Sequence, residues 1–142
     1  MRHGANPDNR YGGWSGYGLT EIGRQAVHRA KHKLLDKGIT SIYSSDLKRA
    51  KETAEIVADT LSLDITYFPQ FREVNNGLLA GMEKSVAFEK YPGKYWSKLA
   101  WTETWHGGEK VRKDSIFVLR VHGIILKNKS EREMPYWLPM AE

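Results

Sequence analysis

The first residues of the chain carry groups that could bind and attack a phosphoryl group. Arg2 and His3 are adjacent, and Gly4 allows the backbone to approach a ligand closely. Asn9 and Arg10 follow in a glycine-rich loop that suits contact with an anion. An imidazole can attack phosphorus directly, and arginines can cover the charge of the phosphoryl oxygens. Arg-His-Gly is also short enough to occur by chance in an ordinary surface loop, so the motif is a hypothesis.

Two residues farther along the chain could complete such a site. Arg49 belongs to the first turn of a predicted helix, beside Ser44 and Ser45, where free backbone N–H groups can face an anion. Glu73 lies in a loop-like segment that ends at Gly77, and a carboxylic acid there could protonate a leaving oxygen. Local sequence alone favours a solvated helix arginine for Arg49, and the plain reading of Glu73 is a surface acid.

Composition sets the class of protein. The 142 residues suggest one domain, and the absence of cysteine excludes disulfides and thiolate chemistry. The net charge of +5 fits either a cleft that attracts anionic substrates or a nucleic-acid-binding surface. Lys and Arg are mixed with acids along the chain, and the stretch from Arg29 to Lys37 is the one dense run. This mixing favours an anionic substrate and predicts no nucleic-acid partner.

The sequence predicts a protein without a membrane anchor. No apolar run approaches the roughly 20 residues that cross a bilayer. The start Met1-Arg2-His3 has no apolar signal-peptide core, and the lack of cysteine fits a reducing compartment. We therefore predict a cytoplasmic location.

The elements that must position these residues follow from hydrophobic periodicity. Thr20 can cap a helix over about residues 21–36, and Gly38 can end it. The run 39–43 predicts a strand, and Ser44-Ser45-Asp46 offers caps for a helix over about 47–61. A second strand is predicted at 65–68, and periodicity leaves 116–126 open between strand and helix. Alternating strands and helices favour an α/β domain with a largely parallel sheet.

Together these residues resemble the histidine phosphatase superfamily, also called phosphoglycerate mutase-like. Five blocks occur in family order over residues 2 to 109. They are Arg2-His3-Gly4 with Asn9, Gly18-Leu19-Thr20-Glu21-Ile22-Gly23, the run from Ser44 to Ala54, Arg72-Glu73 with Gly77 and Gly81, and Gly107-Gly108-Glu109. The run from Ser44 to Ala54 is similar to Ser-Ser-x-Leu-x-Arg-Ala-x-x-Thr-Ala and is the most specific of the five.

The resemblance implies a role for each matching residue. His3 would be the nucleophile that becomes phosphorylated. Arg2 and Arg49 would bind the phosphate, with Asn9 assisting. Glu73 would donate a proton to the leaving alcohol and then activate water. The family requires no metal ion, and the resemblance calls for no cofactor.

The family also carries a second catalytic histidine, which the resemblance assigns to His122. His122 precedes Gly123 after an apolar run, as the end of a strand would. An alternative alignment places residues 113–128 in a helix with Arg120, and this alignment leaves out the second histidine. A buried structural histidine explains His122 equally well.

The fold that the resemblance implies is an α/β three-layer sandwich, with a mainly parallel sheet flanked by helices. Relative to the family, no apolar strand precedes Arg2, and the likeness ends near residue 128. We therefore expect residues 1–142 to form one domain that is truncated at both ends, without the first strand and the C-terminal part. A sheet edge left open in this way favours pairing between copies, so a homo-oligomer is an alternative to a monomer.

The predicted function is hydrolysis of a small phosphorylated substrate through a phosphohistidine on His3, without a metal ion. A phosphatase is preferred over a phosphoglycerate mutase-type phosphotransferase, because a mutase must keep its phosphoenzyme away from water. An inactive family member that acts as a binding protein is a further alternative. A nucleic-acid-binding module is the last alternative, and it predicts one contiguous face of Lys and Arg.

Overall fold

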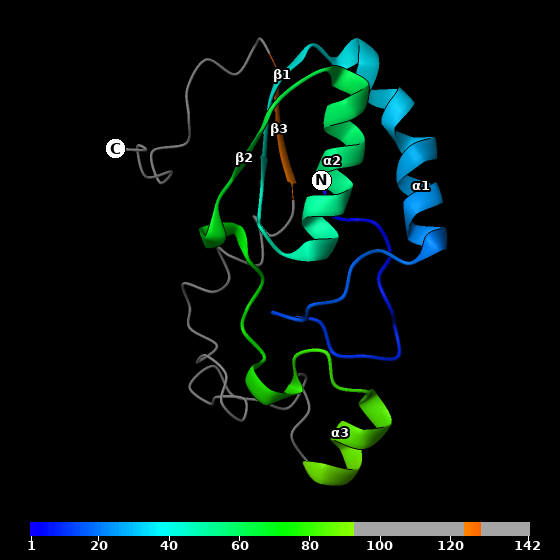
Figure 1. Cartoon of the computed structure of the whole chain (residues 1–142), viewed down its shortest axis with the longest axis vertical. Helices are drawn as coiled ribbons and strands as arrows, with labels where there is room; N and C mark the ends of the chain where they lie inside the picture. Colours follow the sequence, from blue (N-terminus) through cyan, green and yellow to red (C-terminus); the bar gives the residue numbers. More distant parts are fainter. Residues whose placement is uncertain (93–123, 129–142) are drawn as a thin grey trace.

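The computed structural model describes residues 1–92 and 124–128 of the chain (Figure 1). This part combines helices with a small sheet, which confirms the α/β class predicted from the sequence. The helices are α1 (Glu21–Lys31), α2 (Lys48–Leu61) and α3 (Lys84–Lys90), the strands are β1 (Ile39–Ser44), β2 (Ile65–Tyr67) and β3 (Ile124–Asn128), and the short 3₁₀ helices are η1 (His32–Lys37), η2 (Pro69–Phe71) and η3 (Gly77–Leu79).

The three described strands form one sheet in the order β2-β1-β3. β1 and β2 are parallel and are connected through α2, as the strand-helix-strand order predicted. β3 runs antiparallel to β1, with Ile124 opposite Ser44. The alternative alignment that placed residues 113–128 in a helix is wrong for residues 124–128, because these residues form a strand.

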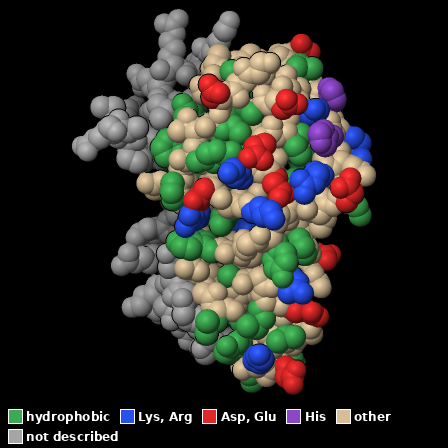
Figure 2. Space-filling view, in the orientation of Figure 1, with side chains coloured by type: hydrophobic (Ala, Val, Ile, Leu, Met, Phe, Trp, Pro, Cys, Tyr) green, Lys and Arg blue, Asp and Glu red, His purple; other side chains and the backbone are tan. Residues whose placement is uncertain are grey.

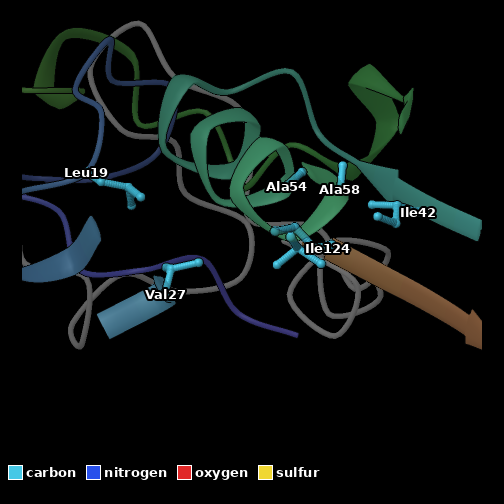
Figure 3. Close-up of a cluster of buried hydrophobic side chains, with 7 residues drawn as sticks. Leu19, Val27, Ile42, Ala54, Ala58 and Ile124 are labelled. Carbon is cyan, nitrogen blue, oxygen red and sulfur yellow. The ribbon is translucent and has the colours of Figure 1, made fainter. Parts of the chain in front are cut away.

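The main hydrophobic core lies between α2, α1 and the sheet (Figures 1 and 3). α2 contacts β1 and β2, and α1 packs on α2. Small residues on the inner face of α2 let the helix lie close to its neighbours, because they leave room for larger aliphatic side chains. The buried members of the core are Leu19, Val27, Ile42, Ala54, Val57, Ala58 and Ile124.

The start of α1 agrees with the prediction, and its end differs. The Thr20 hydroxyl oxygen accepts a hydrogen bond from the Gly23 N–H at 3.0 Å, which caps the helix as expected. The α-helix ends at Lys31 and continues as η1, whereas one helix to about residue 36 was predicted. The last turns tighten into a 3₁₀ helix, as helix ends often do, before Gly38 reverses the chain at φ 59°.

The predicted caps of α2 are wrong. Leu47 occupies the N-cap position and provides no side-chain hydrogen bond to the helix. Two of the three polar side chains before it have other partners. Ser44 Oγ donates to the Ser45 carbonyl oxygen at 2.9 Å, and the Asp46 carboxylate pairs with the Arg72 guanidinium.

Main-chain pairing places the predicted nucleophile at the end of the sheet. Met1 exchanges two main-chain hydrogen bonds with Ile124, at 2.6 and 3.0 Å. Because Ile124 lies opposite Ser44, residues 2 and 3 leave the sheet at the carboxyl end of β1. The segment that leads to Arg49 leaves from the same end. α/β sheets bind their ligands at this end of the strands.

Close backbone contact holds the segment after His3 against α1. A Cβ atom at Gly4 would lie 2.8 Å from Val27 Cγ2, and one at Gly23 would lie 2.1 Å from the Ala5 carbonyl oxygen. The same Ala5 oxygen accepts the Thr20 N–H at 2.9 Å. The two glycines are therefore required by the distance between loop and helix.

Replacing Gly23 by alanine should consequently destabilise the fold. The added methyl group meets backbone rather than a flexible side chain, so we expect the free energy of unfolding to fall by about 1–3 kcal/mol. Urea denaturation measures this change. Gly16→Ala is the matched control, because nothing lies within 4 Å of its Cβ position, and its change should stay below about 1 kcal/mol. Equal losses in the two variants would contradict the packing argument.

Candidate active site

One cavity of about 520 Å³ collects four of the six residues predicted from the sequence. Arg2, His3, Arg49 and Glu73 all contribute to its lining. They come from the segment after Met1, from the first turn of α2 and from the loop after η2. The other lining residues are Gly4, Ala5, Asn6, Pro7, Asp8, Arg10, Gly12 and Lys84.

Arg49 is the common partner of the segments around the cavity. Its side chain is 2% exposed. Nε donates to His3 Nε2 at 3.1 Å, and Nη2 donates to Glu73 Oε2 at 2.7 Å. Nη2 also donates to the Gly13 carbonyl oxygen at 2.9 Å, and Nη1 to Ser15 Oγ at 3.4 Å. A buried guanidinium needs such partners for its N–H groups, so it ties three segments to the start of α2.

The contacts of His3 define its tautomer. Nδ1 lies 2.7 Å from the Gly4 carbonyl oxygen, which can only accept, so Nδ1 carries the proton. Nε2 lies 3.1 Å from Arg49 Nε, which can only donate, so Nε2 carries the lone pair. The neutral imidazole therefore presents Nε2 as its nucleophilic atom, and Arg49 holds that atom in place.

The surroundings of His3 lower its pKa below 6.5, the ordinary value. Burial is the largest cause, because it disfavours the charged imidazolium. The hydrogen bond to Gly4 opposes this effect, the charges of Arg49 and Arg2 add to it, and Glu73 again opposes it. The net result is a histidine that stays neutral to a lower pH than usual, as a nucleophile requires.

Thr53 joins the segment after His3 to α2, a contact that was not predicted from the sequence. Its hydroxyl donates to the Arg49 carbonyl oxygen at 2.7 Å and accepts the Gly4 N–H at 3.1 Å. The side chain is fully buried. Its position four residues after Arg49, on the same face of α2, was the available signal.

The backbone of Glu73 is held by its neighbours, and its carboxyl group faces the cavity. Its neighbours Phe71 and Val74 are buried and anchor the loop. The Trp14 indole N–H donates to the Glu73 carbonyl oxygen at 2.7 Å. The Glu73 side chain is 33% exposed, so its carboxyl group contacts both Arg49 and the space of the cavity.

The two remaining predicted site residues are Asn9 and His122, and neither is among the described residues that line the cavity. Asn9 is exposed and does not line the cavity. Its carbonyl oxygen accepts the Lys84 N–H at 2.9 Å, so its visible role is to hold the start of α3. His122 lies outside the described residues.

Arg10 and Lys84 line the cavity although the resemblance did not include them. Arg10 Nη1 donates to the Gly81 carbonyl oxygen at 3.1 Å, and its guanidinium lies 5.1 Å from the centre of the Tyr17 ring. A bridge between Arg10 and Glu83 brings the following residue, Lys84, to the wall. This pairing joins residues more than 70 positions apart, so local sequence carried no signal for Lys84.

The charges of the cavity favour an anionic ligand. Four cationic side chains line it, against the carboxylates of Asp8 and Glu73. Clefts lined mostly by one sign of charge concentrate ligands of the opposite sign. In the part of the chain that the structure describes, no three His, Asp or Glu side chains are grouped to hold a metal ion.

The distribution of charged side chains on the surface bears on the nucleic-acid-binding alternative. On the face in Figure 2, Lys and Arg alternate with Asp and Glu over the helices, so this face is not the contiguous basic surface which that alternative predicts. Among the described residues, no helix has the length and apolar character needed to cross a membrane.

The chain is similar in sequence to known proteins. A family model of the histidine phosphatase superfamily (branch 1) matches residues 1–132. The probable phosphoglycerate mutase GpmB of Yersinia pestis is 42% identical over 82 residues, which are 56% of this chain and 38% of that protein. The chain therefore matches less than half the length of this curated relative.

Solved phosphatase structures have a similar fold. A mycobacterial glucosyl-3-phosphoglycerate phosphatase, solved with VO3, has a TM-score of 0.70 and 28% identity, over 84% of this chain and 61% of that one. A putative alpha-ribazole-5'-P phosphatase of Escherichia coli has a TM-score of 0.69 over 84% of this chain and 64% of that one. Its 23% identity supports a likeness of fold alone.

NMR titration of the His3 ring should give a pKa below 6.5. Because burial and two arginine charges disfavour the imidazolium, the ring should remain mostly neutral, with the proton on Nδ1, at pH 6.5 and gain its second proton only as the pH falls further. In Arg49→Gln the pKa should rise, since a charge that opposes protonation is removed. A wild-type pKa at or above 6.5 would contradict the geometry described above.

Proposed function

The chain belongs to the histidine phosphatase superfamily (branch 1), and we propose that it is a phosphomonoester hydrolase that works through a phosphohistidine on His3 without a metal ion. One observation carries the proposal. A single buried guanidinium, that of Arg49, contacts both the lone-pair nitrogen of His3 and the carboxylate of Glu73 in a cavity rich in cations.

In the first step, a phosphomonoester binds with its phosphoryl oxygens against Arg2 and Arg49. One of these oxygens accepts the hydrogen bond that Arg49 Nε donates to His3 Nε2 in the free protein. The lone pair of Nε2 then becomes available. Nε2 then attacks phosphorus, the N–P bond forms and the bond from phosphorus to the ester oxygen breaks. Glu73, as the carboxylic acid, gives its proton to the departing oxygen, so an alcohol leaves.

In the second step, water attacks the phosphorus of the phosphohistidine. Glu73, now a carboxylate, takes a proton from this water. The N–P bond breaks, inorganic phosphate forms and the lone pair returns to His3 Nε2. Positive side chains cover the charge of the phosphoryl oxygens throughout, which is the main contribution that a protein makes to phosphoryl transfer.

A phosphoglycerate mutase-type phosphotransferase is the second candidate. The likeness to the probable mutase of Yersinia pestis favours it, whereas the names of the solved neighbours favour hydrolysis. The two candidates share the first step and differ in the acceptor, which is water for a hydrolase and a second hydroxyl group for a mutase. Release of free phosphate from a phosphomonoester with no second hydroxyl group distinguishes them.

Hydrolysis of p-nitrophenyl phosphate tests the proposed function. His3→Ala should lower kcat/KM by at least about a thousandfold, because the nucleophile is gone. His28→Ala is the matched control, since His28 is an exposed histidine of α1 that does not line the cavity, and it should keep the wild-type rate. Treatment with EDTA should leave the rate unchanged. Equal rates for wild type and His3→Ala would show that the chain is not this enzyme.

A further inference from the structure

Arg72, the residue before Glu73, is held by a carboxylate from the loop that precedes α2. Its Nε donates to Asp46 Oδ1 at 2.5 Å, and its Nη2 donates to Asp46 Oδ2. This two-point contact connects the Glu73 loop to the segment that carries Arg49. The hydrogen bonds from Arg72 also hold the pKa of Asp46 below its usual range, so the pair remains charged at neutral pH.

Trp14 holds the same loop from the other side. The Arg72 guanidinium lies over its ring, 4.7 Å from the ring centre, and its indole N–H donates to the Glu73 carbonyl oxygen at 2.7 Å. Trp14 also lies between Gly13 and Ser15, both of which accept hydrogen bonds from Arg49. The indole therefore connects the loop that surrounds Arg49 to the backbone of Glu73.

These contacts matter because the Glu73 carboxyl group belongs to the segment that they hold. Trp14 fixes the Glu73 backbone, and Asp46 fixes the residue before it. A proton passes to a leaving oxygen only within hydrogen-bond reach, so the position of the Glu73 backbone decides whether its carboxyl group reaches the substrate.

We infer that Trp14, Arg72 and Asp46 form a positioning clamp, which fixes the Glu73 backbone and so sets the position of the Glu73 carboxyl group. This inference rests on the proposed function, because it assigns the clamp to the proton-transfer step. Stability is a weaker explanation for the three contacts. Arg72 and Asp46 are each about a third exposed, and exposed ion pairs contribute little to folding.

In the first step of the reaction, the clamp affects the breaking of the bond between phosphorus and the ester oxygen. As the ester bond of the substrate breaks, the proton on Glu73 moves to the departing oxygen, and the need for this proton grows with the basicity of that oxygen. p-Nitrophenolate is a weak base and leaves almost without a proton, whereas phenolate is more basic. A disturbed clamp should therefore slow phenyl phosphate hydrolysis far more than p-nitrophenyl phosphate hydrolysis.

The measurement is the ratio of kcat/KM for p-nitrophenyl phosphate to that for phenyl phosphate, in the full chain. The ratio does not depend on how much of a variant is folded, so partial misfolding cannot produce the effect. Asp46→Asn and Trp14→Phe should each raise the ratio about tenfold or more, since small displacements of a catalytic group cost up to about a hundredfold. Asp46→Glu, which keeps the carboxylate, should restore most of the wild-type ratio.

Arg24→Gln is the matched control. It removes a partly exposed ion pair between Arg24 of α1 and Glu52 of α2, neither of which lines the cavity, so its ratio should equal that of wild type. An unchanged ratio in both Asp46→Asn and Trp14→Phe would overturn the clamp, and so would an equal rise in Arg24→Gln. Failure of the proposed function is a separate result, because wild type would then hydrolyse neither substrate by way of His3.

Discussion

The buried guanidinium of Arg49 is the constraint on which this site depends. A cation that is 2% exposed is costly unless its N–H groups find acceptors, and removing one partner of a buried ion pair typically costs about 3–5 kcal/mol. Here the acceptors come from His3, Gly13, Ser15 and Glu73, which lie on three separate segments. The need to pair one side chain therefore brings together the proposed nucleophile His3, the carboxyl group of Glu73 and the loop that contains Gly13 and Ser15.

Several features that look independent in the sequence follow from this need. Gly13 must present its carbonyl oxygen to Arg49 from a left-handed conformation, φ 63°, while a Cβ atom there would lie 2.9 Å from the Val74 carbonyl oxygen. Only glycine meets both conditions without strain. Thr53, one helical turn after Arg49, fixes the backbone next to His3. The same requirement thus places a glycine in one loop and a threonine on α2.

Much of this arrangement could be predicted from sequence, because its main signals are local. Hydrophobic periodicity located α2 and both strands of the parallel pair, and the run from Ser44 to Ala54 identified Arg49. The predictions failed where a distant partner changed a local preference. Asp46 is a good helix cap by residue type. Its carboxylate instead accepts hydrogen bonds from the Arg72 guanidinium, and Leu47 occupies the N-cap position of α2. Lys84 reaches the cavity through a bridge between Arg10 and Glu83, which no short window of sequence reveals.

The central claim is that His3 Nε2, freed from Arg49 by the bound phosphate, takes the phosphoryl group. Trapping the phosphoenzyme with a ³²P-labelled phosphomonoester tests this claim most directly. A phosphohistidine loses its label in acid and keeps it in alkali, and the account predicts this behaviour for a label on His3 that is absent from His3→Ala. Label that survives acid, or that persists in His3→Ala, would contradict the account.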